Sequence, residues 1–383
     1  MTQSANVEAN PVAGSSGEAG RKPLLRVDAL QKQFGATTVL RSVSFDLAEG
    51  ECIALLGPSG CGKTTTLRCV AGLEQPDAGQ ILLEDRLLNG NGKSVAPQER
   101  QMGLVFQSYS VWPHLTVYEN VAFGLKLRGV KAAAIRERVG GILDLMDIGP
   151  LAQRRSWQLS GGQLQRVALA RTLVVEPRLV LFDEPLSNLD AKLRLYMRVE
   201  IRSLLKRLGM SAVYVTHDQS EASVVADRIA VMNGGRIEQL GSWADLYHAP
   251  VSRFVADFMG AGNLLEATVV ADMGDGVRVE AGGGLPQWTV AQRSGPPAKP
   301  GQRVQLCVPR EAVTLLAAGA GACRGTVAGV LPGPGVFELL ISLDGDRTLS
   351  TMRLAGSAVP AEGEACGLDI DESRIRMLAD TVE

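Results

Sequence analysis

The sequence predicts an α/β domain built on a parallel sheet, followed by a small all-β domain. Strands buried on both faces are apolar at every position, unlike strands with one face in water. Four short runs have this character, at residues 53–56, 179–182, 212–215 and 229–232. Beyond about residue 260 the chain changes to short Val-rich runs separated by Gly and Pro, which is typical of a small β-barrel.

The chain begins with a polar segment and has the composition of a globular protein. Residues 1–22 are rich in Ser, Ala, Gly, Asn and Glu and lack an apolar signal segment, so we expect a disordered tail. Of the 383 residues, 45% are hydrophobic and 21% are charged, which suits a sizeable core. The formal net charge of -2 favours no nucleic-acid partner, and no run approaches the ~18 apolar residues of a membrane span.

Six cysteines lie at positions 52, 61, 69, 307, 323 and 366. They form no Cys-x-x-Cys pair, and no histidine lies at metal-ligand spacing near them. This pattern predicts reduced and mostly buried thiols in a cytosolic protein.

A phosphate-binding loop follows the first apolar run. Residues 57–64 read Gly-Pro-Ser-Gly-Cys-Gly-Lys-Thr, a complete P-loop between a strand and a helical pattern. Its glycines let backbone N–H groups turn toward phosphates at the helix N-terminus. We expect Lys63 to reach the β- and γ-phosphates and the Thr64 hydroxyl to bind Mg²⁺. The first domain is therefore predicted to be a P-loop NTPase (RecA-like) that hydrolyses ATP.

Helical periodicity dominates about residues 108–177, which we interpret as an insertion in the α/β domain. Residues 159–163 read Leu-Ser-Gly-Gly-Gln and open one of its helices, with Ser160 at the N-cap. This is either an ordinary capped helix or a second anion site. A single nucleotide needs only one P-loop, so a second phosphate site would need another explanation.

Polar residues follow the later apolar runs, at the carboxyl ends of parallel strands where ligands gather. Asp183 would hold the Mg²⁺ shell, and Glu184 would act as general base on the attacking water. The alternative, an ordinary acidic pair at a strand end, is disfavoured by the P-loop. His217 ends another run, and the Asn-Gly-Gly sequence at residues 233–235 predicts a hairpin at the edge of the sheet.

Together these motifs resemble those of the ATP-binding subunits of ABC transporters, over about residues 24–259. The matching features are the P-loop, Gln107, residues 159–163, Asp183 with Glu184, residues 187–190, and His217. The resemblance implies an ABC ATPase domain at residues 23–259. It also implies that two copies pair head to tail around two ATP molecules, each signature touching the γ-phosphate held by the other P-loop. ATP then favours the closed dimer more than ADP does, since a ligand shifts an equilibrium by its differential affinity.

The resemblance also implies roles for individual residues. The implied catalytic residues are Glu184, His217 and Gln107. The implied metal-binding residues are Thr64, Gln107 and Asp183. The implied ATP-binding residues are Phe34, Gly57, Pro58, Ser59, Gly60, Cys61, Gly62, Lys63, Thr64, Thr65, Ser160, Gly161, Gly162, Gln163 and Asp190. Without the resemblance, Gln107 would be a polar strand end, His217 a structural residue, Phe34 a core residue and Asp190 a helix cap.

Two segments resemble the importer branch of the family. Residues 107–117 match the region that meets a membrane subunit, so Trp112 is a candidate docking contact, with local core as the alternative. Residues 260–383, with Gly262-Asn263 and residues 308–313, resemble the OB-like regulatory TOBE domain. The chain departs from the family at residues 309–311, which read Pro-Arg-Glu where the family often has Arg-Pro-Glu.

The resemblance thus implies a peripheral ATPase on the cytoplasmic face of the inner (plasma) membrane. Its partners would be a second copy of itself, two integral-membrane permease subunits and, indirectly, a periplasmic solute-binding protein. The sequence at residues 108–123 favours a polyamine or ferric-iron importer over a sugar importer. Sugar, glycerol-phosphate and sulfate importers are the alternatives, followed by a soluble ABC ATPase acting on DNA or the ribosome. A small-molecule kinase would leave residues 159–163 without a role.

Overall fold

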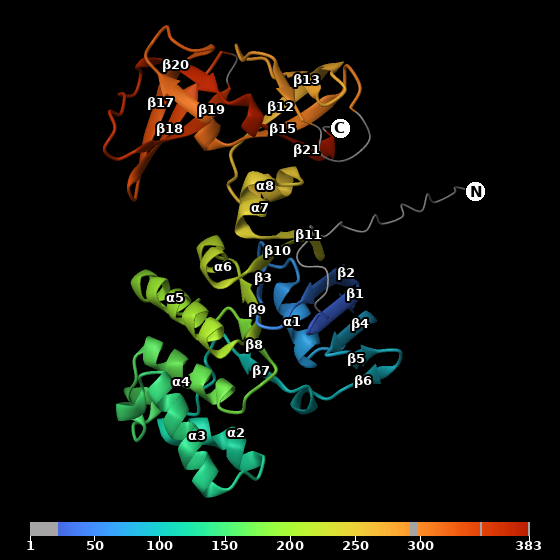
Figure 1. The fold of residues 1–383 in the computed structure, drawn as a ribbon, viewed down its shortest axis with the longest axis vertical. Coiled ribbons are helices and arrows are strands. Elements are labelled where there is room, and N and C mark those ends of the chain that lie inside the picture. Colours follow the sequence, from blue (N-terminus) through green and yellow to red (C-terminus); the bar gives the residue numbers. More distant parts are fainter. Residues whose placement is uncertain (1–21, 292–297, 345–346, 382–383) are drawn as a thin grey trace, which may run out of the picture. The chain divides into compact units, whose positions relative to one another are not determined.

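The structure is a computed structural model that describes residues 22–291, 298–344 and 347–381 (Figure 1). The predicted tail at residues 1–22 therefore lies outside the described residues, apart from Lys22. The chain divides into two compact units, the first ending at Ser242 and the second beginning at Trp243.

The first unit is built on a six-stranded sheet in the order β11-β10-β3-β9-β8-β7. Neighbours from β10 to β7 are parallel, which confirms the predicted parallel sheet, and β11 is antiparallel to β10. Asn233 pairs with Arg236, so the predicted hairpin is also confirmed. The strands are β3 (Cys52–Leu56), β7 (Met102–Val105), β8 (Leu179–Asp183), β9 (Ser211–Thr216), β10 (Arg228–Asn233) and β11 (Arg236–Gly241).

Both faces of this sheet are buried, because successive side chains of a strand enter different cores. Leu181 and Val213 pack with helix α1 (Lys63–Ala71) and the N-terminal strands. Phe182 and Tyr214 pack with the helical insertion and α5 (Ala191–Leu208). In Figure 1, α1 lies on one side of the sheet and α5 and α6 (Gln219–Val225) on the other. The continuous apolar runs in the sequence follow from this two-sided cover.

A second, antiparallel sheet has the order β2-β1-β4-β5-β6 and lies beside α1 (Figure 1). Leu25, Leu40 and Ile81 from this sheet are fully buried against the α1 core. Its strands are β1 (Leu25–Phe34), β2 (Thr37–Leu47), β4 (Ala78–Leu83), β5 (Arg86–Gly90) and β6 (Lys93–Ser94). Helix α1 is thus enclosed between two sheets, which fixes the loop from which it starts.

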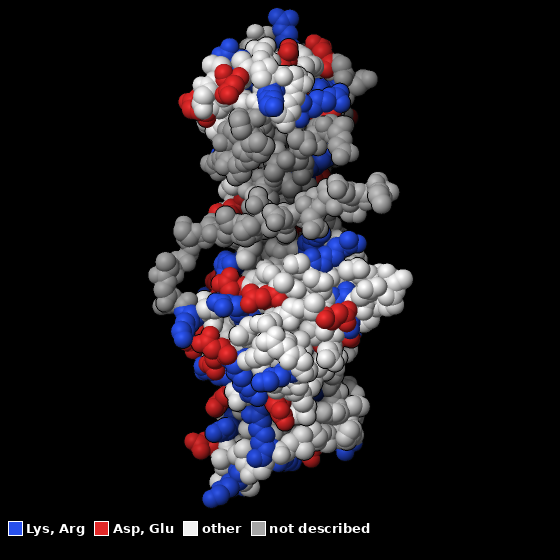
Figure 2. Space-filling model, turned by 90° about the vertical axis from the view of Figure 1, so that its right-hand side faces the viewer, with Lys and Arg blue, Asp and Glu red and all other residues white. Residues whose placement is uncertain are grey.

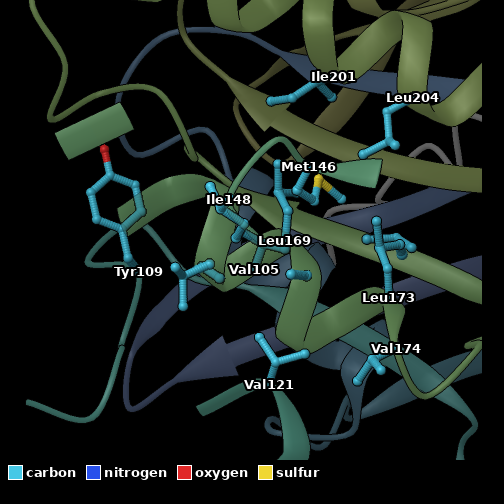
Figure 3. Close-up of a cluster of buried hydrophobic side chains, with 14 of the residues drawn as sticks. Val105, Tyr109, Val121, Met146, Ile148, Leu169, Leu173, Val174, Ile201 and Leu204 are labelled. Atoms are coloured by element: carbon cyan, nitrogen blue, oxygen red, sulfur yellow. The ribbon is translucent and has the colours of Figure 1, made fainter. Parts of the chain in front are cut away.

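The predicted helical insertion is confirmed by α2 (Val117–Leu127), α3 (Ala132–Leu145) and α4 (Gly161–Leu173). Helix α2 begins at a capping box, in which Thr116 and Glu119 satisfy each other's backbone N–H groups. Val121, Leu169 and Leu173 from these helices belong to one buried cluster with Ile201 and Leu204 of α5 (Figure 3). Short 3₁₀ turns connect the elements, at η1 (Pro97–Glu99), η2 (Gly149–Leu151) and η3 (Ser156–Gln158).

The second unit opens with two short helices and continues as two five-stranded sheets, which confirms the predicted all-β segment. The helices are α7 (Trp243–His248) and α8 (Arg253–Phe258). One sheet has the order β14-β13-β12-β15-β21, with β12 (Asn263–Asp272), β13 (Val277–Glu280), β14 (Trp288–Val290), β15 (Arg303–Val308) and β21 (Arg376–Thr381). The other has the order β16-β20-β17-β18-β19, with β16 (Val313–Leu316), β17 (Cys323–Gly333), β18 (Val336–Ser342), β19 (Thr348–Leu354) and β20 (Ala365–Ile370). Two 3₁₀ turns complete the unit, η4 (Arg310–Ala312) and η5 (Glu372–Arg374).

A buried amide joins the two sheets of this unit. Asn263 donates from Nδ2 to the carbonyls of Val308 (3.2 Å) and Ser350 (3.0 Å). Its Oδ1 accepts the Ser350 backbone N–H at 2.6 Å. Because both ends of the Asn263 amide are bonded while the residue is buried, β12, β15 and β19 are held in one arrangement.

The boundary between the units differs from the predicted one at residues 259 and 260, since helices α7 and α8 belong to the second unit. Ala256 of α8 packs in one cluster with Ala261, Cys307 and Leu378, and Tyr247 of α7 lies against it. The Tyr247 hydroxyl also donates to Glu311 at 2.9 Å. The change from helical to strand texture in the sequence therefore falls inside the second unit, past its beginning.

All six thiols are free and buried, which agrees with the expectation of reduced cysteines. Burial raises the pKa of Cys52 and Cys69 to about 12 and that of Cys307 to about 11. No helix in the described part of the chain is long and apolar enough to span a bilayer. Over the described residues on the face shown in Figure 2, Lys and Arg side chains lie interspersed with Asp and Glu.

Shortening a buried side chain of the central strand β8 tests this packing. We expect Leu181→Ala to lower the free energy of unfolding of the first unit by about 2–5 kcal/mol, because Leu181 is fully buried and its loss leaves a cavity. Leu127→Ala is the matched control, since this leucine is 74% exposed. Urea unfolding followed by circular dichroism measures both, and an equal, small effect of the two changes would contradict a two-sided core.

Candidate nucleotide site

The P-loop runs from the end of β3 to the start of α1, and two of its glycines are required by its shape. A Cβ on Gly57 would lie 2.3 Å from the carbonyl oxygen of Met232. Gly62 caps α1 in a left-handed conformation, with φ of 105°, and a Cβ there would lie 2.6 Å from Leu40. The loop therefore wraps closely around the N-terminus of α1, where backbone N–H groups attract anions.

The Lys63 ammonium lies inside this loop. Its Nζ donates to the carbonyls of Gly57 (2.8 Å) and Pro58 (2.9 Å), and the residue is only 6% exposed. A buried cation at the positive end of a helix is suited to a multiply charged anion such as a triphosphate. The cradle formed by the glycines and Lys63 thus fits the phosphates of ATP.

Thr64 and Asp183 meet across the sheet, although they are far apart in sequence. The Thr64 hydroxyl donates to Asp183 Oδ1 at 3.1 Å. Burial raises the pKa of Asp183, and its hydrogen bond from Thr64 opposes that shift. One hydroxyl and one carboxylate fit Mg²⁺, which binds through few protein oxygens together with substrate phosphates and water. No cluster of three or more His, Cys, Asp or Glu suited to a metal was found among the described residues.

Glu184 and His217 lie together beside this pair. The distance between His217 Nδ1 and Glu184 Oε2 is 3.4 Å. Glu184 has a left-handed backbone with φ of 47°, which is strained for a residue with a side chain. Its N–H donates to the Val215 carbonyl at 3.1 Å and its carbonyl accepts the Ser187 hydroxyl at 3.0 Å. These bonds fix the Glu184 backbone at the strand end, and His217 is the contact made by its carboxylate.

The remaining predicted residues lie on the loops around these strand ends. Gln107 is exposed, and its carbonyl accepts the Asn188 side-chain amide at 2.8 Å. Asp190 caps α5 by accepting the Leu193 N–H at 2.9 Å. Phe34 ends β1 and is 47% exposed, so it is a surface residue. The other residues predicted to bind ATP are Ser59, Gly60 and Cys61 in the P-loop and Thr65 in α1.

The Ser160 segment starts α4 with a capping box. Ser160 Oγ accepts the Gln163 N–H at 3.4 Å, and Gln163 Oε1 accepts the Ser160 N–H at 3.0 Å. Gly161 and Gly162 leave room for neighbours, because a Cβ on either would lie 3.1–3.2 Å from Leu189 or Leu193. The start of α4 is thus packed against the start of α5, with Asp190 between those two leucines in sequence.

Comparison with known proteins identifies the family. Residues 40–187 match the family described as ABC transporter. The chain is 44% identical over 334 residues to the spermidine/putrescine import ATP-binding protein PotA of Rubrobacter xylanophilus, covering 87% of each protein. This chain belongs to the family of ABC importer ATP-binding subunits. It is an ATPase of the kind coupled to transmembrane import, as predicted.

Two further relatives define the extent of the similarity to ABC subunits. The sn-glycerol-3-phosphate import ATP-binding protein UgpC 1 of Rhizobium johnstonii is 42% identical over 361 residues, covering 93% of this chain and 94% of the relative. The solved structure of cbiO1 from Clostridium perfringens, part of the ABC transporter complex cbiONQ, has a TM-score of 0.55 and 28% identity. It covers 61% of this chain and 94% of its own, so the solved relative corresponds to a part of this ABC subunit.

Sequence reasoning missed the side chains that hold the loop after Gln107 in this ABC subunit. Trp112 is half-buried, with its ring 4.5 Å from Phe123 and 4.8 Å from the Arg171 guanidinium. Arg171 of α4 also donates to the carbonyl of Tyr109 at 2.9 Å. Trp112 is therefore neither a fully exposed docking residue nor a fully buried core residue. Its ring packs against Phe123 and Arg171 and stays partly exposed. Arg171 lies 64 residues from Gln107, and only the fold brings them together.

A buried carboxylate in α6, four residues after His217 in sequence, was also missed. Glu221 is 3% exposed and accepts hydrogen bonds from Thr216 (2.8 Å) and Tyr214 (3.2 Å). Burial raises the pKa of Glu221. A glutamate in the first turn of a helix is common as a surface residue, so the sequence carried no signal for this burial.

Proposed function

We propose that this ABC importer subunit works as a head-to-tail dimer that closes around two ATP molecules with Mg²⁺. The observation that carries the proposal is the placement of Thr64, Asp183, Glu184 and His217 at the carboxyl ends of the neighbouring strands β3, β8 and β9. The start of α4, with its capped and exposed Ser160, is a second helix end suited to an anion. Because the P-loop of the same copy already holds the phosphates of its own ATP, this helix end would serve the ATP of a second copy. In the dimer each such end would meet the γ-phosphate held by the other copy.

The residues of one copy would divide the hydrolysis between them. Lys63 and the loop N–H groups bind the β- and γ-phosphates. Thr64 and Asp183, with Gln107, would hold Mg²⁺, which supplies charge neutralisation for the phosphates. Glu184 accepts a proton from the attacking water while the water oxygen bonds to the γ-phosphorus. The bond between the γ-phosphorus and the oxygen that leaves with ADP breaks. His217 orients the Glu184 carboxylate and contacts the γ-phosphate.

The remaining nucleotide contacts follow the same proposal. Phe34 stacks on the adenine ring, and its exposure at the end of β1 supports this role. Asp190 lies in the loop between the two sites of the dimer, and its packing beside the α4 start supports that placement. Ser160, Gly161, Gly162 and Gln163 form the half-site offered to the other copy.

Permease subunits are the proposed membrane partners. The docking region would include the loop around Trp112 and the neighbouring Phe123, which is 36% exposed. The chain would then act on the cytoplasmic face of the inner membrane, bound through two permeases, with a periplasmic binding protein delivering the solute. The second unit, at residues 243–383, is proposed to be the regulatory TOBE domain, of which residues 260–383 were predicted.

The transported solute is proposed to be a polyamine or ferric iron. Relatives of similar identity are named for spermidine and putrescine, for sn-glycerol-3-phosphate, for trehalose and maltose, and for Fe(3+) ions, the last being FbpC of Agrobacterium fabrum at 45% identity over 299 residues. Sugar and glycerol-phosphate import therefore stay as the alternatives. The preference rests on the sequence of residues 108–123.

Uptake by the assembled transporter tests the proposal. In proteoliposomes with its permeases and binding protein, Lys63→Ala is expected to abolish ATP-dependent uptake, because the γ-phosphate loses its buried cation. Lys93→Ala, at an exposed lysine of β6, is the matched control and should leave uptake unchanged. Labelled spermidine, Fe³⁺, glycerol phosphate and maltose are compared side by side. Uptake that persists in Lys63→Ala would contradict the ATPase role, and uptake of only the last two solutes would contradict the proposed substrate.

A further inference from the structure

A lysine lies against the ring of Phe34 at the end of β1. The Lys32 ammonium is 4.9 Å from the centre of the Phe34 ring, within the distance at which a cation is attracted to an aromatic face. Phe34 nevertheless stays 47% exposed. The ring is therefore held from one side by a charge while much of its surface is open to a flat ligand.

The ammonium that holds the ring is itself fixed by three oxygen atoms. Lys32 Nζ donates to the Gln75 carbonyl at 2.7 Å, and it lies 2.9 Å from Glu74 Oε1 and 3.6 Å from Asp77 Oδ1. The Lys32 side chain is only 11% exposed. The hydrogen bond to Glu74 raises the pKa of Lys32, so the side chain keeps its charge at neutral pH. This cation is much better anchored than an ordinary surface lysine.

The anchoring residues belong to the segment that leaves α1. Gly72 caps the C-terminus of α1, and residues 74–77 follow directly. Asp77 ties this segment to β1 twice more, because its Oδ2 accepts the Gln33 N–H at 2.6 Å and its own N–H donates to the Gln31 carbonyl at 2.9 Å. Since α1 begins at the P-loop, one rigid helix connects the phosphate cradle to the junction that holds Lys32.

We propose that Lys32 is a positioning residue for the nucleobase of ATP. It holds the Phe34 ring in a fixed position relative to the P-loop. Because the ring is already ordered, binding of adenine does not have to offset the entropy of ordering that side chain. Lys32 itself touches neither the base nor the phosphates in this role. The proposal rests on the proposed function, in which Phe34 binds adenine, and it adds the residue that makes that contact selective for a nucleotide over a bare polyphosphate.

Calorimetric titration of the full chain with ATP and with inorganic tripolyphosphate tests this role. We expect Lys32→Met to raise the Kd for ATP about three- to tenfold, the range of a cation–π contact, and to change the Kd for tripolyphosphate less than about twofold. Lys32→Arg should restore most of the ATP affinity, since it keeps the charge near the ring. Lys22→Met is the matched control, because Lys22 pairs with Asp85 at 3.2 Å on the exposed surface of the same unit.

A double-mutant cycle shows whether Lys32 acts through Phe34. In a Phe34→Ala background, Lys32→Met should have no further effect on the Kd for ATP. Equal weakening of ATP and tripolyphosphate by Lys32→Met would overturn the proposal, because the lysine would then support the P-loop. Lys32→Met leaving the Kd for ATP unchanged, or Phe34→Ala leaving the ratio of the two Kd values unchanged, would also overturn it. Wild-type protein that binds neither ligand would instead contradict the proposed function.

Discussion

Glu184→Gln is expected to lower the turnover number for ATP by about 10²–10⁴-fold, the usual contribution of a general base. The amide keeps the size of the carboxylate but cannot accept the proton of the attacking water. Affinity for ATP should change little, because Lys63 and the P-loop glycines, which are proposed to bind the phosphates, are untouched. Phosphate release measures turnover, and titration with the nucleotide measures affinity.

Glu176→Gln is the matched control for this change. Glu176 has a left-handed backbone like Glu184, with φ of 51° against 47°, and its side chain is 75% exposed. Any general effect of glutamine at a strained backbone position should therefore be the same in both variants. Turnover that survives in Glu184→Gln, or falls equally in Glu176→Gln, would contradict the assignment of the general base.

Ser160→Arg, made in the Glu184→Gln background, is expected to prevent ATP-dependent dimerisation. Glu184→Gln alone should accumulate ATP-bound dimer, because the substrate binds but is not consumed. The arginine side chain fills the space at the α4 start where the γ-phosphate of the other copy would approach, so we expect the dimer fraction to fall at least about tenfold, which corresponds to ~1.4 kcal/mol. Size-exclusion chromatography with and without ATP measures the dimer fraction.

Thr116→Arg controls for the loss of a helix cap. Thr116 begins α2 with the same kind of capping box as Ser160 begins α4, and both helices belong to the insertion. Each change removes a cap worth about 1 kcal/mol, but only one alters the proposed half-site. Thr116→Arg should still dimerise with ATP. Closed dimers in Ser160→Arg would contradict the site shared between two copies, while binding of ATP to the single copy should persist in both.

The sequence predicted which residues of the candidate site lie at or beside strand ends. Strands buried on both faces are recognisable as continuous apolar runs. Asp183 directly follows one of them, and His217 follows another after Thr216. Parallel strands place their carboxyl ends at one edge, so the contact between Thr64 and Asp183 could be expected before any distance was known. The order β11-β10-β3-β9-β8-β7 could not, because strand neighbours depend on crossovers that leave no local pattern.

Contacts made by single side chains across long sequence separations were also beyond prediction. Lys32 and Glu74 are 42 residues apart, and no local periodicity relates them. The left-handed backbone of Glu184 is a second example, since glycine is the residue that normally marks such a conformation. The beginning of the second unit at Trp243 was missed for a related reason. Helices α7 and α8 look in sequence like the helices before them, and only their packing assigns them to the β domain.

The six buried thiols divide evenly between the two units. Cys52, Cys61 and Cys69 lie in the first unit, and Cys307, Cys323 and Cys366 lie in the second. A thiol reacts as its thiolate, and burial disfavours that form wherever it raises the pKa. Oxidants and alkylating reagents therefore find little thiolate at Cys52, Cys69 and Cys307 while both units stay folded. A unit that opens exposes its own three cysteines and leaves the other three protected, so the positions of chemical modification along the chain record which unit lost its packing.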